Sequence, residues 1–419
     1  MFSIDIHLFL LRRKEMKKVL SVVLSAAMAL SLCTGCSSSS GKETTAAQTE
    51  SAAEAAGETA EAGAETGEAK AAEGVMPAIP KEDLKVGVIH IGNPADGSGY
   101  SYAHDLGIVA MQEAVGLEDS QIIRKNNVAD DDQTAIETAM RECVEEGCQI
   151  IFATSWGYMD ACEALADEFP EVIFSHGTGY KSNGVNFNNY FGRIYQSRYL
   201  SGIAAGLKTE SNKIGYVGAW GKDNAEVTGG CNAFAMGVYS VNPDATVYIK
   251  TTNSWYDPEG EKQAAVALIN EGCDVIGQHC DTPNPQLAAE ENGVYGVGYN
   301  SDMSKDAPKA VLTSTVWNWG AYYTSAVQSL VDGTWTGENY FGGLKEGLVD
   351  LAPLSDLCAE GTAEKIEEAK AKIVSGEWDV FDGVIECNDG TTVGTEGEHM
   401  SDADITGNIH WYFKNVVEK

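Results

Sequence analysis

With 419 residues, of which 43% are hydrophobic, the chain is long enough for about two or three domains with sizeable cores. Its 28 lysine and arginine residues against 62 aspartate and glutamate residues give a formal net charge of -34. This charge argues against a nucleic-acid partner, because phosphate binding needs a basic surface, and against electrostatic attachment to an anionic bilayer.

The first predicted element is an export signal. Lys17 and Lys18 precede an apolar run at 19–32, and small residues follow it. The run is too short and too abruptly ended by Gly and Ser for a transmembrane helix. We therefore expect residues 1–35 to be a signal peptide. Residues 1–15 fit no part of such a signal, so Met16 is an alternative start.

Cys36 stands directly after Thr34 and Gly35, at the end of the apolar run. This arrangement is similar to the lipobox of bacterial lipoproteins, in which the cysteine is diacylated and becomes the first residue of the mature protein. The sequence departs from that pattern at Cys33, where lipoboxes usually carry Leu. We expect Cys36 to be lipidated and to anchor the protein to the outer side of the cell membrane. The alternative is ordinary secretion with loss of Cys36.

Residues 36–80 consist largely of Ser, Ala, Gly, Thr and Glu and contain no aromatic residue. Such a segment cannot bury enough apolar surface to offset the entropy lost on ordering. The sequence therefore predicts a disordered acidic tether, which would hold a folded body clear of a membrane.

Strands and helices alternate after Pro80. Residues 85–91 form a buried strand, residues 129–146 show helical spacing ended by Gly147, and residues 149–153 and 172–174 form further strands. This alternation is typical of a parallel sheet with helices on both faces.

The same unit recurs later in the chain. The strand KIGYVG at 213–218 is similar to KVGVIHI at 85–91, and EGCDVI at 271–276 is similar to EGCQII at 146–151. A repeat at a spacing of roughly 125 residues indicates two similar α/β lobes. We place lobe 1 at 81–207 and lobe 2 at 208–307. Further on, the Asp-Gly turn within 384–393 predicts a hairpin.

The sequence contains no HExxH, GxSxG, P-loop or complete GxGxxG motif. The nearest approach, Gly97 and Gly99 after the first strand, lacks the third glycine of a dinucleotide fingerprint. We therefore expect neither catalysis nor a cofactor.

The cysteines that follow Cys36 are scattered through helix and strand patterns. They are Cys143, Cys148, Cys162, Cys231, Cys273, Cys280, Cys358 and Cys387. No CxxC or Cys/His cluster has the spacing of a metal site, so we expect buried thiols and no bound metal.

Aromatic residues accompany carboxylates where the predicted strands end. The site candidates are Tyr100, Tyr102, Trp156, Trp255, Asp281, Asp302 and Trp317. In open α/β sheets ligands bind at the carboxyl ends of the strands. A flat heteroaromatic ligand suits this combination, because rings stack on its faces, at ~1–3 kcal/mol per base, while carboxylates accept its N–H groups. The alternative is that several of these rings pack in the core or the hinge.

Six segments in order resemble the basic membrane protein family of bacterial ABC-transporter receptors, which includes the purine nucleoside receptors. They are GYSYAHD at 99–105, TSWGYMD at 154–160, HGTGYK at 176–181, NSWYDP at 253–258, SDM at 301–303 and KEGLV at 345–349. The resemblance covers residues 85–353. It implies a type I periplasmic-binding-protein fold, in which two Rossmann-like lobes are joined by a hinge of three chain crossings. Residues 308–419 would then supply crossings and return to both lobes.

The resemblance also implies a receptor without catalysis or metal, which delivers its ligand to a permease and an ATPase; we expect a monomer. Positions matching the family's ligand contacts are Tyr100, Trp156, Trp255, Asp281 and Asp302. Nucleoside receptors of the family typically carry Lys where this chain has Trp317, a departure that favours a bare purine base such as adenine. Three alternatives stay open: a receptor for a sugar or another polar solute, a secreted enzyme acting on nucleosides, and a signalling lipoprotein on the same fold.

Overall fold

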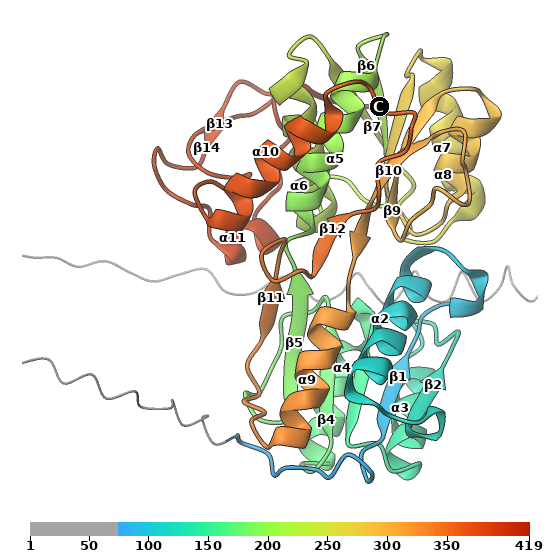
Figure 1. The fold of residues 1–419 in the computed structure, drawn as a ribbon, viewed down its shortest axis with the longest axis vertical. Helices are drawn as coiled ribbons and strands as arrows, with labels where there is room; N and C mark the ends of the chain where they lie inside the picture. Colours follow the sequence, from blue (N-terminus) through green and yellow to red (C-terminus); the bar gives the residue numbers. More distant parts are fainter. Residues whose placement is uncertain (1–73) are drawn as a thin grey trace, which may run out of the picture. The chain divides into compact units, whose positions relative to one another are not determined.

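Two β-sheets organise residues 74–419, the part of the chain that the computed structural model describes (Figure 1). The predicted signal peptide, Cys36 and most of the predicted tether lie outside the described residues. Each sheet carries helices on both faces, which gives the two α/β lobes that the sequence repeat predicted.

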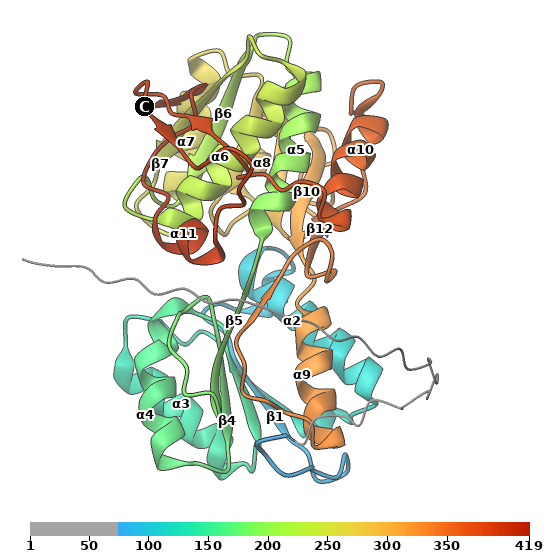
Figure 2. The same cartoon turned by 90° about the vertical axis from the view of Figure 1, so that its left-hand side faces the viewer.

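Lobe 1 has a six-stranded sheet in which all neighbours run parallel. Its order is β11 (Tyr340–Gly342), β5 (Phe187–Gly192), β4 (Ile173–Gly177), β3 (Ile150–Ala153), β1 (Val86–Ile89) and β2 (Ile122–Lys125). The helices α2 (Gly99–Val115) and α9 (Gly320–Asp332) cover one face, and α3 (Gln133–Glu145) and α4 (Met159–Glu168) cover the other (Figure 2). The central strands are continuous apolar runs because both of their faces are buried.

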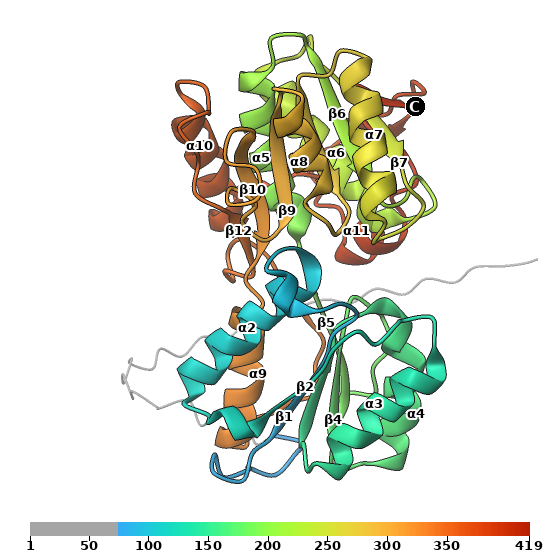
Figure 3. The same cartoon turned by 90° about the vertical axis from the view of Figure 1, so that its right-hand side faces the viewer.

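Lobe 2 has a seven-stranded sheet. Its order is β12 (Val349–Leu351), β10 (Val311–Trp317), β9 (Tyr295–Asn300), β8 (Val275–His279), β6 (Lys213–Gly218), β7 (Thr246–Thr251) and β15 (Val416–Glu418). Only β12 runs antiparallel to its neighbour. The helices α5 (Ile194–Lys208) and α6 (Ala225–Val241) pack on one face, and α7 (Pro258–Asn270) and α8 (Asn284–Glu291) on the other (Figure 3). The helix α10 (Thr362–Ser375) packs on α5.

The chain passes between the lobes three times within residues 74–419. It leaves lobe 1 between β5 and α5, returns between β10 and α9, and leaves again between β11 and β12 (Figure 2). Lobe 1 is therefore completed by α9 and β11, which come more than a hundred residues after its other elements.

The folded body begins before the predicted boundary at residue 81. The backbone N–H of Val75 donates to the carbonyl of Trp335, 2.7 Å away, and that of Ile79 donates to Leu330, 2.9 Å away. Met76 and Ile79 pack against the core of lobe 1. These apolar side chains distinguish 74–80 from the Ser/Ala/Glu composition before it, so the prediction of disorder up to residue 80 extended too far.

Two local predictions are confirmed. The hairpin at 384–393 forms as β13 (Ile385–Glu386) and β14 (Thr392–Val393), with Gly390 at a φ of 84° in the turn. The eight cysteines of the described residues are unpaired, and all except the half-buried Cys358 are buried.

Candidate functional site

A cavity of about 860 Å³ lies between the two lobes. Lobe 1 lines it with residues that follow β1, β3 and β4, and lobe 2 with residues that follow β6, β7 and β8. Parallel strands leave a crevice at their carboxyl ends, which is where open α/β sheets bind ligands. The volume falls within the range of ~300–1,000 Å³ that is typical of small-molecule sites.

The wall from lobe 1 presents two aromatic rings to the cavity. Trp156 is 53% exposed and Tyr180 is 68% exposed, and their ring centroids are 5.8 Å apart. Trp156 opens the short turn η3 (Trp156–Tyr158) directly after β3. A Cβ at Gly157 would lie 1.9 Å from the carbonyl oxygen of Asp130, so only glycine allows the turn to pack so closely there. The backbone under Trp156 is thus fixed while its ring stays open.

Tyr100 adds a ring from the start of α2. Its ring meets that of His104 edge-on, with centroids 4.5 Å apart, and its hydroxyl donates to the carbonyl of Thr154. Burial raises the pKa of Tyr100 well above its ordinary value, so the phenol stays neutral. The side chain is therefore a fixed, uncharged part of the cavity wall.

The carboxyl groups on the wall from lobe 2 include Glu226 in the first turn of α6 and Asp281 after β8. Burial raises the pKa of Glu226 to about 7, although the positive charge of Arg198 opposes this shift. Burial, together with the neighbouring Glu261 carboxylate, raises the pKa of Asp281 well above its ordinary value. Asp281 accepts one hydrogen bond from the Asn300 amide, 3.1 Å away.

Arg198 lies behind these acids and is 2% exposed. Its guanidinium lies 4.0 Å from the ring centroid of Tyr299 and donates to the Tyr216 hydroxyl and the Gln278 carbonyl, 2.9 and 2.8 Å away. Burial lowers the pKa of His279 well below its ordinary value, so its imidazole, 3.4 Å from the Glu226 carboxylate, is neutral. The acids therefore keep acceptor oxygens for groups that enter the cavity.

The lobes also touch beside the cavity. The backbone N–H of Gly99 donates to the Ser301 hydroxyl, 3.1 Å away, and the Ser98 hydroxyl donates to Asp306, 3.0 Å away. Gly99 has a φ of 82°, and a Cβ there would lie 2.3 Å from the carbonyl oxygen of Asp281. The start of α2 therefore lies directly against the loop that carries one of the cavity acids.

The structure brings four of the predicted ligand-binding residues, Tyr100, Trp156, Trp255 and Asp281, together in the cavity wall. Tyr102 does not line the cavity, because two residues along a helix turn its side chain about 200° away from that of Tyr100. Asp302 does not line it either. It is exposed, and its carboxylate accepts the N–H of Ser304, 2.9 Å away, in the turn after β9.

Trp317 is the third predicted residue outside the cavity lining. It is 6% exposed and stacks on Trp319 with ring centroids 4.3 Å apart and an interplanar angle of 14°. Its indole N–H donates to the Tyr299 hydroxyl, 3.2 Å away. Trp317 therefore packs in the hinge, at the second crossing. Hinge packing was the alternative to ligand contact that the sequence left open.

Among the cavity-wall residues that sequence reasoning missed are Tyr180, Trp220 and Glu226. Each follows a strand, β4 for Tyr180 and β6 for the other two. The rule that selected Trp156 could therefore have found them. Glu226 in particular has the sequence signature of an ordinary acid in the first turn of a helix.

Comparison with known proteins identifies the family. The Bmp family model, described as ABC transporter substrate-binding protein PnrA-like, matches residues 84–382. The chain belongs to the Bmp family. It is 38% identical over 339 residues, 81% of this chain and 94% of the relative, to a purine-binding protein of Brucella abortus. It is 35% identical over 285 residues, 68% of this chain and 71% of the relative, to a candidate ABC transporter glucose-binding protein of Haloferax volcanii.

Solved structures of ABC transporter solute-binding proteins share the fold. One from Conexibacter woesei has a TM-score of 0.60 at 21% identity, covering 71% of this chain and 98% of its own. One from Aeropyrum pernix has a TM-score of 0.60 at 18% identity, covering 70% of this chain and 92% of its own. The predicted periplasmic-binding-protein fold is confirmed.

Membership of the Bmp family makes this chain a substrate-binding protein of an ABC transporter rather than an enzyme. Such proteins bind small ligands outside the cytoplasm and work with permease and ATPase subunits. Within residues 74–419 no helix has the length and apolar character needed to cross a membrane. In the same residues no group of His, Cys, Asp or Glu side chains is arranged to hold a metal ion.

Proposed function

We propose that the protein is the receptor of an ABC importer for a purine, either an adenine-like nucleobase or a nucleoside. The observation that carries this proposal is the opposition of two kinds of group across one cavity. Lobe 1 presents the exposed rings of Trp156 and Tyr180, and lobe 2 presents the carboxyl groups of Glu226 and Asp281. The Brucella abortus relative, a purine-binding protein, supports the same ligand class.

The geometry suggests how a purine is held. A flat ring stacks on an exposed indole or phenol, which removes apolar surface of both partners from water. Its N–H groups donate to carboxylates on the facing lobe, in charge-assisted hydrogen bonds of the stronger kind. A purine that stacks on the exposed rings of lobe 1 and donates to the carboxyl groups of lobe 2 would link the lobes and favour the closed receptor.

Calorimetry on protein freed of co-purified solute tests this proposal. The folded body is unfolded, washed and refolded, and is then titrated with adenine, adenosine and glucose. Binding of either purine at micromolar concentration, which corresponds to about -8 kcal/mol, is the expected result. If neither purine produces heat at millimolar concentration, the proposed ligand class is wrong.

A sugar receptor is the second candidate, because the Haloferax volcanii relative is a candidate glucose-binding protein. Sugars also stack on tryptophan and donate hydroxyl hydrogens to carboxylates. A sugar ring is saturated and puckered rather than flat and aromatic, so a sugar gains less than a purine from a second ring such as Tyr180. Binding of glucose without binding of either purine would favour this candidate.

The proposal extends to the attachment of the receptor. Lipidation of Cys36 and the acidic segment after it would tether a monomeric receptor to the outer side of the membrane, beside its permease and ATPase. The expected result is that the intact chain fractionates with membranes and that Cys36→Ser releases it. Mass spectrometry of the N-terminal peptide gives the control, since a lipidated Cys36 carries the diacyl mass. A soluble wild-type chain would contradict the anchor.

A further inference from the structure

The C-terminal segment contributes to the cavity although the match to the Bmp family ends at residue 382. Residues 383–419 form the hairpin β13–β14, the helix α11 (Asp402–Gly407) and the strand β15. The strand β15 pairs with β7, and Ile409 and Tyr412 are fully buried. Figure 2 shows α11 on the side of lobe 2 that faces lobe 1. The segment is therefore an integral part of lobe 2.

The residues after α11 are attached to lobe 2 by several hydrogen bonds. His410 Nδ1 donates to the carbonyl of Lys222, 2.6 Å away. The Asn232 side chain on α6 donates to the carbonyl of Trp411 at 2.7 Å and accepts the N–H of Phe413 at 2.8 Å. Asn232 is fully buried, so these bonds are shielded from water. This end of α11 is fixed to the helix that carries Glu226.

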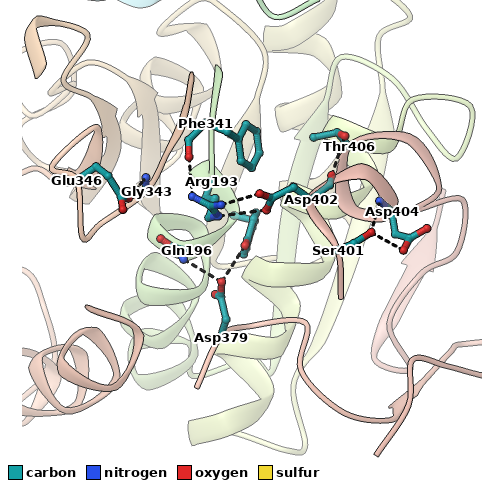
Figure 4. A network of polar contacts seen from close by, with 11 residues as sticks. Arg193, Gln196, Phe341, Gly343, Glu346, Asp379, Ser401, Asp402, Asp404 and Thr406 are labelled. Carbon is teal, nitrogen blue, oxygen red and sulfur yellow. Dashed lines mark hydrogen bonds and ion pairs between the residues drawn. The ribbon is translucent and has the colours of Figure 1, made fainter. Parts of the chain in front are cut away.

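The start of α11 is attached to the hinge instead. Arg193 donates to both carboxylate oxygens of Asp402, at 2.6 and 3.2 Å, and to the carbonyl of Phe341 at 2.6 Å (Figure 4). Arg193 lies at the first crossing and Phe341 at the third. A two-pronged guanidinium–carboxylate contact fixes orientation as well as distance. The helix is thus held against the two crossings as well as against lobe 2.

Six residues of this segment line the cavity: Asp402, Ala403, Ile405, Thr406, Gly407 and His410. They supply a side of the cavity that neither sheet's strand-end loops provide. Because both ends of the segment are attached, this side is a wall of defined position rather than a free loop.

We propose that residues 402–410 are a specificity-determining wall that sets the largest purine the cavity accepts. The inference rests on the proposed function and deepens it. A bare base held between the rings of lobe 1 and the acids of lobe 2 needs little of the remaining space. A base that carries a ribose needs more, and the wall decides whether that space exists.

Gly407 allows a direct test. Its φ is not in the left-handed region, and a Cβ built there meets no atom within 4 Å. A bulky side chain at this position therefore enters open space without displacing the backbone. Gly407→Phe is expected to weaken adenosine binding at least tenfold more than adenine binding in calorimetry, a difference of about 1.4 kcal/mol. Equal losses for both ligands, or no loss for either, would contradict the proposal that residues 402–410 limit the size of the ligand.

Two control variants accompany this test. Gly407→Ala adds one methyl group at the same position and should change the ratio of the two affinities less than Gly407→Phe does. Glu396→Phe adds the same ring to the same segment at an exposed position outside the cavity lining and should leave the ratio unchanged. Thermal unfolding of every variant checks that the fold is kept. A change of ratio in Glu396→Phe would contradict a local wall.

Asp402→Asn tests the attachment to the hinge. Losing the charged contact with Arg193 should loosen the wall, so that adenosine affinity rises relative to adenine affinity by about threefold or more. An unchanged ratio would show that the contact does not position the wall.

The outcomes separate this inference from the proposed function. If the wild-type protein binds glucose and neither purine, the proposed function fails. The same variants are then titrated with glucose and maltose, and the wall predicts a larger loss for maltose in Gly407→Phe. If the wild-type protein binds none of these solutes, both the function and the wall are rejected.

Discussion

The two lobes are built on the same unit and differ in what they present to the cavity. In lobe 1 the Lys85 ammonium donates to the carbonyl of Glu146, 2.8 Å away, at the end of α3. In lobe 2 the Lys213 ammonium donates to the carbonyl of Glu271, 3.1 Å away, at the end of α7. The glycines that follow, Gly147 and Gly272, have φ values of 87° and 94°. The two lobes therefore share the same framework, including the glycine turn that follows the corresponding helix.

The cavity walls of the two lobes differ in their exposed rings and buried acids, although Trp220 and Trp255 of lobe 2 and Asp130 of lobe 1 also line the cavity. Lobe 1 presents rings whose faces are open to solvent, at Trp156 and Tyr180. Lobe 2 presents acids whose pKa values are raised by burial, at Glu226 and Asp281. The comparison teaches that the repeat preserves the sheet and helix framework while the loops after the strands carry the chemistry. It also implies that closure brings the exposed rings of lobe 1 and the acids of lobe 2 to the same ligand.

Removing the exposed rings of lobe 1 should weaken ligand binding more than any other change. The double variant Trp156→Ala/Tyr180→Ala is expected to weaken purine binding about a hundredfold, because each stacking contact contributes ~1–3 kcal/mol. Calorimetry measures the loss. Tyr256→Ala is the matched control, since Tyr256 is 63% exposed and lies outside the cavity lining. A loss below about threefold in the double variant would show that the rings do not contact the ligand.

Replacing an acid should have the next largest effect. Asp281→Asn is expected to weaken purine binding about tenfold or more, because the amide replaces an acceptor oxygen with a donor that faces the N–H groups of the ligand, and an unpaired buried donor costs ~1–3 kcal/mol. Asp302→Asn is the control, because Asp302 is exposed and outside the cavity lining. The reverse pattern, with Asp302 important and Asp281 not, would contradict the role that the cavity geometry gives to Asp281.

The raised pKa of Glu226, about 7, predicts a pH dependence. Below that value the carboxyl is protonated and loses its charge, so a ligand N–H donating to it loses a charge-assisted bond. Purine affinity should fall about tenfold at most between pH 8 and pH 6, and binding at pH 6 should release protons, because the ligand favours the ionised form. Glu226→Gln should flatten the profile. Calorimetry in buffers of different ionisation enthalpy counts the protons, and an affinity that rises toward pH 6 would contradict the acceptor role.

Substitutions in the framework that the two lobes share should have the smallest effects, and these effects should be on stability. Lys85→Met and Lys213→Met should each lower the free energy of unfolding by about 0.5 kcal/mol, because each removes a cation from a helix C-terminus. Neither variant should change ligand affinity. Urea denaturation measures the stabilities. A change in affinity for one of them would show that the framework and the cavity are not separable.

Much of the framework could be predicted from the sequence, because its signals are local. Apolar runs bounded by turns located the strands, and the repeated Glu-Gly-Cys turn indicated two lobes. The site was predicted less completely. The rule that ligands bind where strands end selected Trp156 and Asp281, which line the cavity. It also selected Asp302, whose side chain instead accepts a hydrogen bond within its own turn.

The sequence by itself determined the family, the two-lobed framework and the kinds of residue at the strand ends, since each follows from patterns a few residues long. Only the tertiary structure decided which of these side chains reach the cavity. Trp317 is packed into the hinge by Trp319, and Glu226 acquires its raised pKa from burial among groups distant in sequence. The wall formed by α11 likewise depends on Arg193, which lies about two hundred residues before Asp402. Burial and direction are properties of packing, and packing joins segments that no local pattern relates.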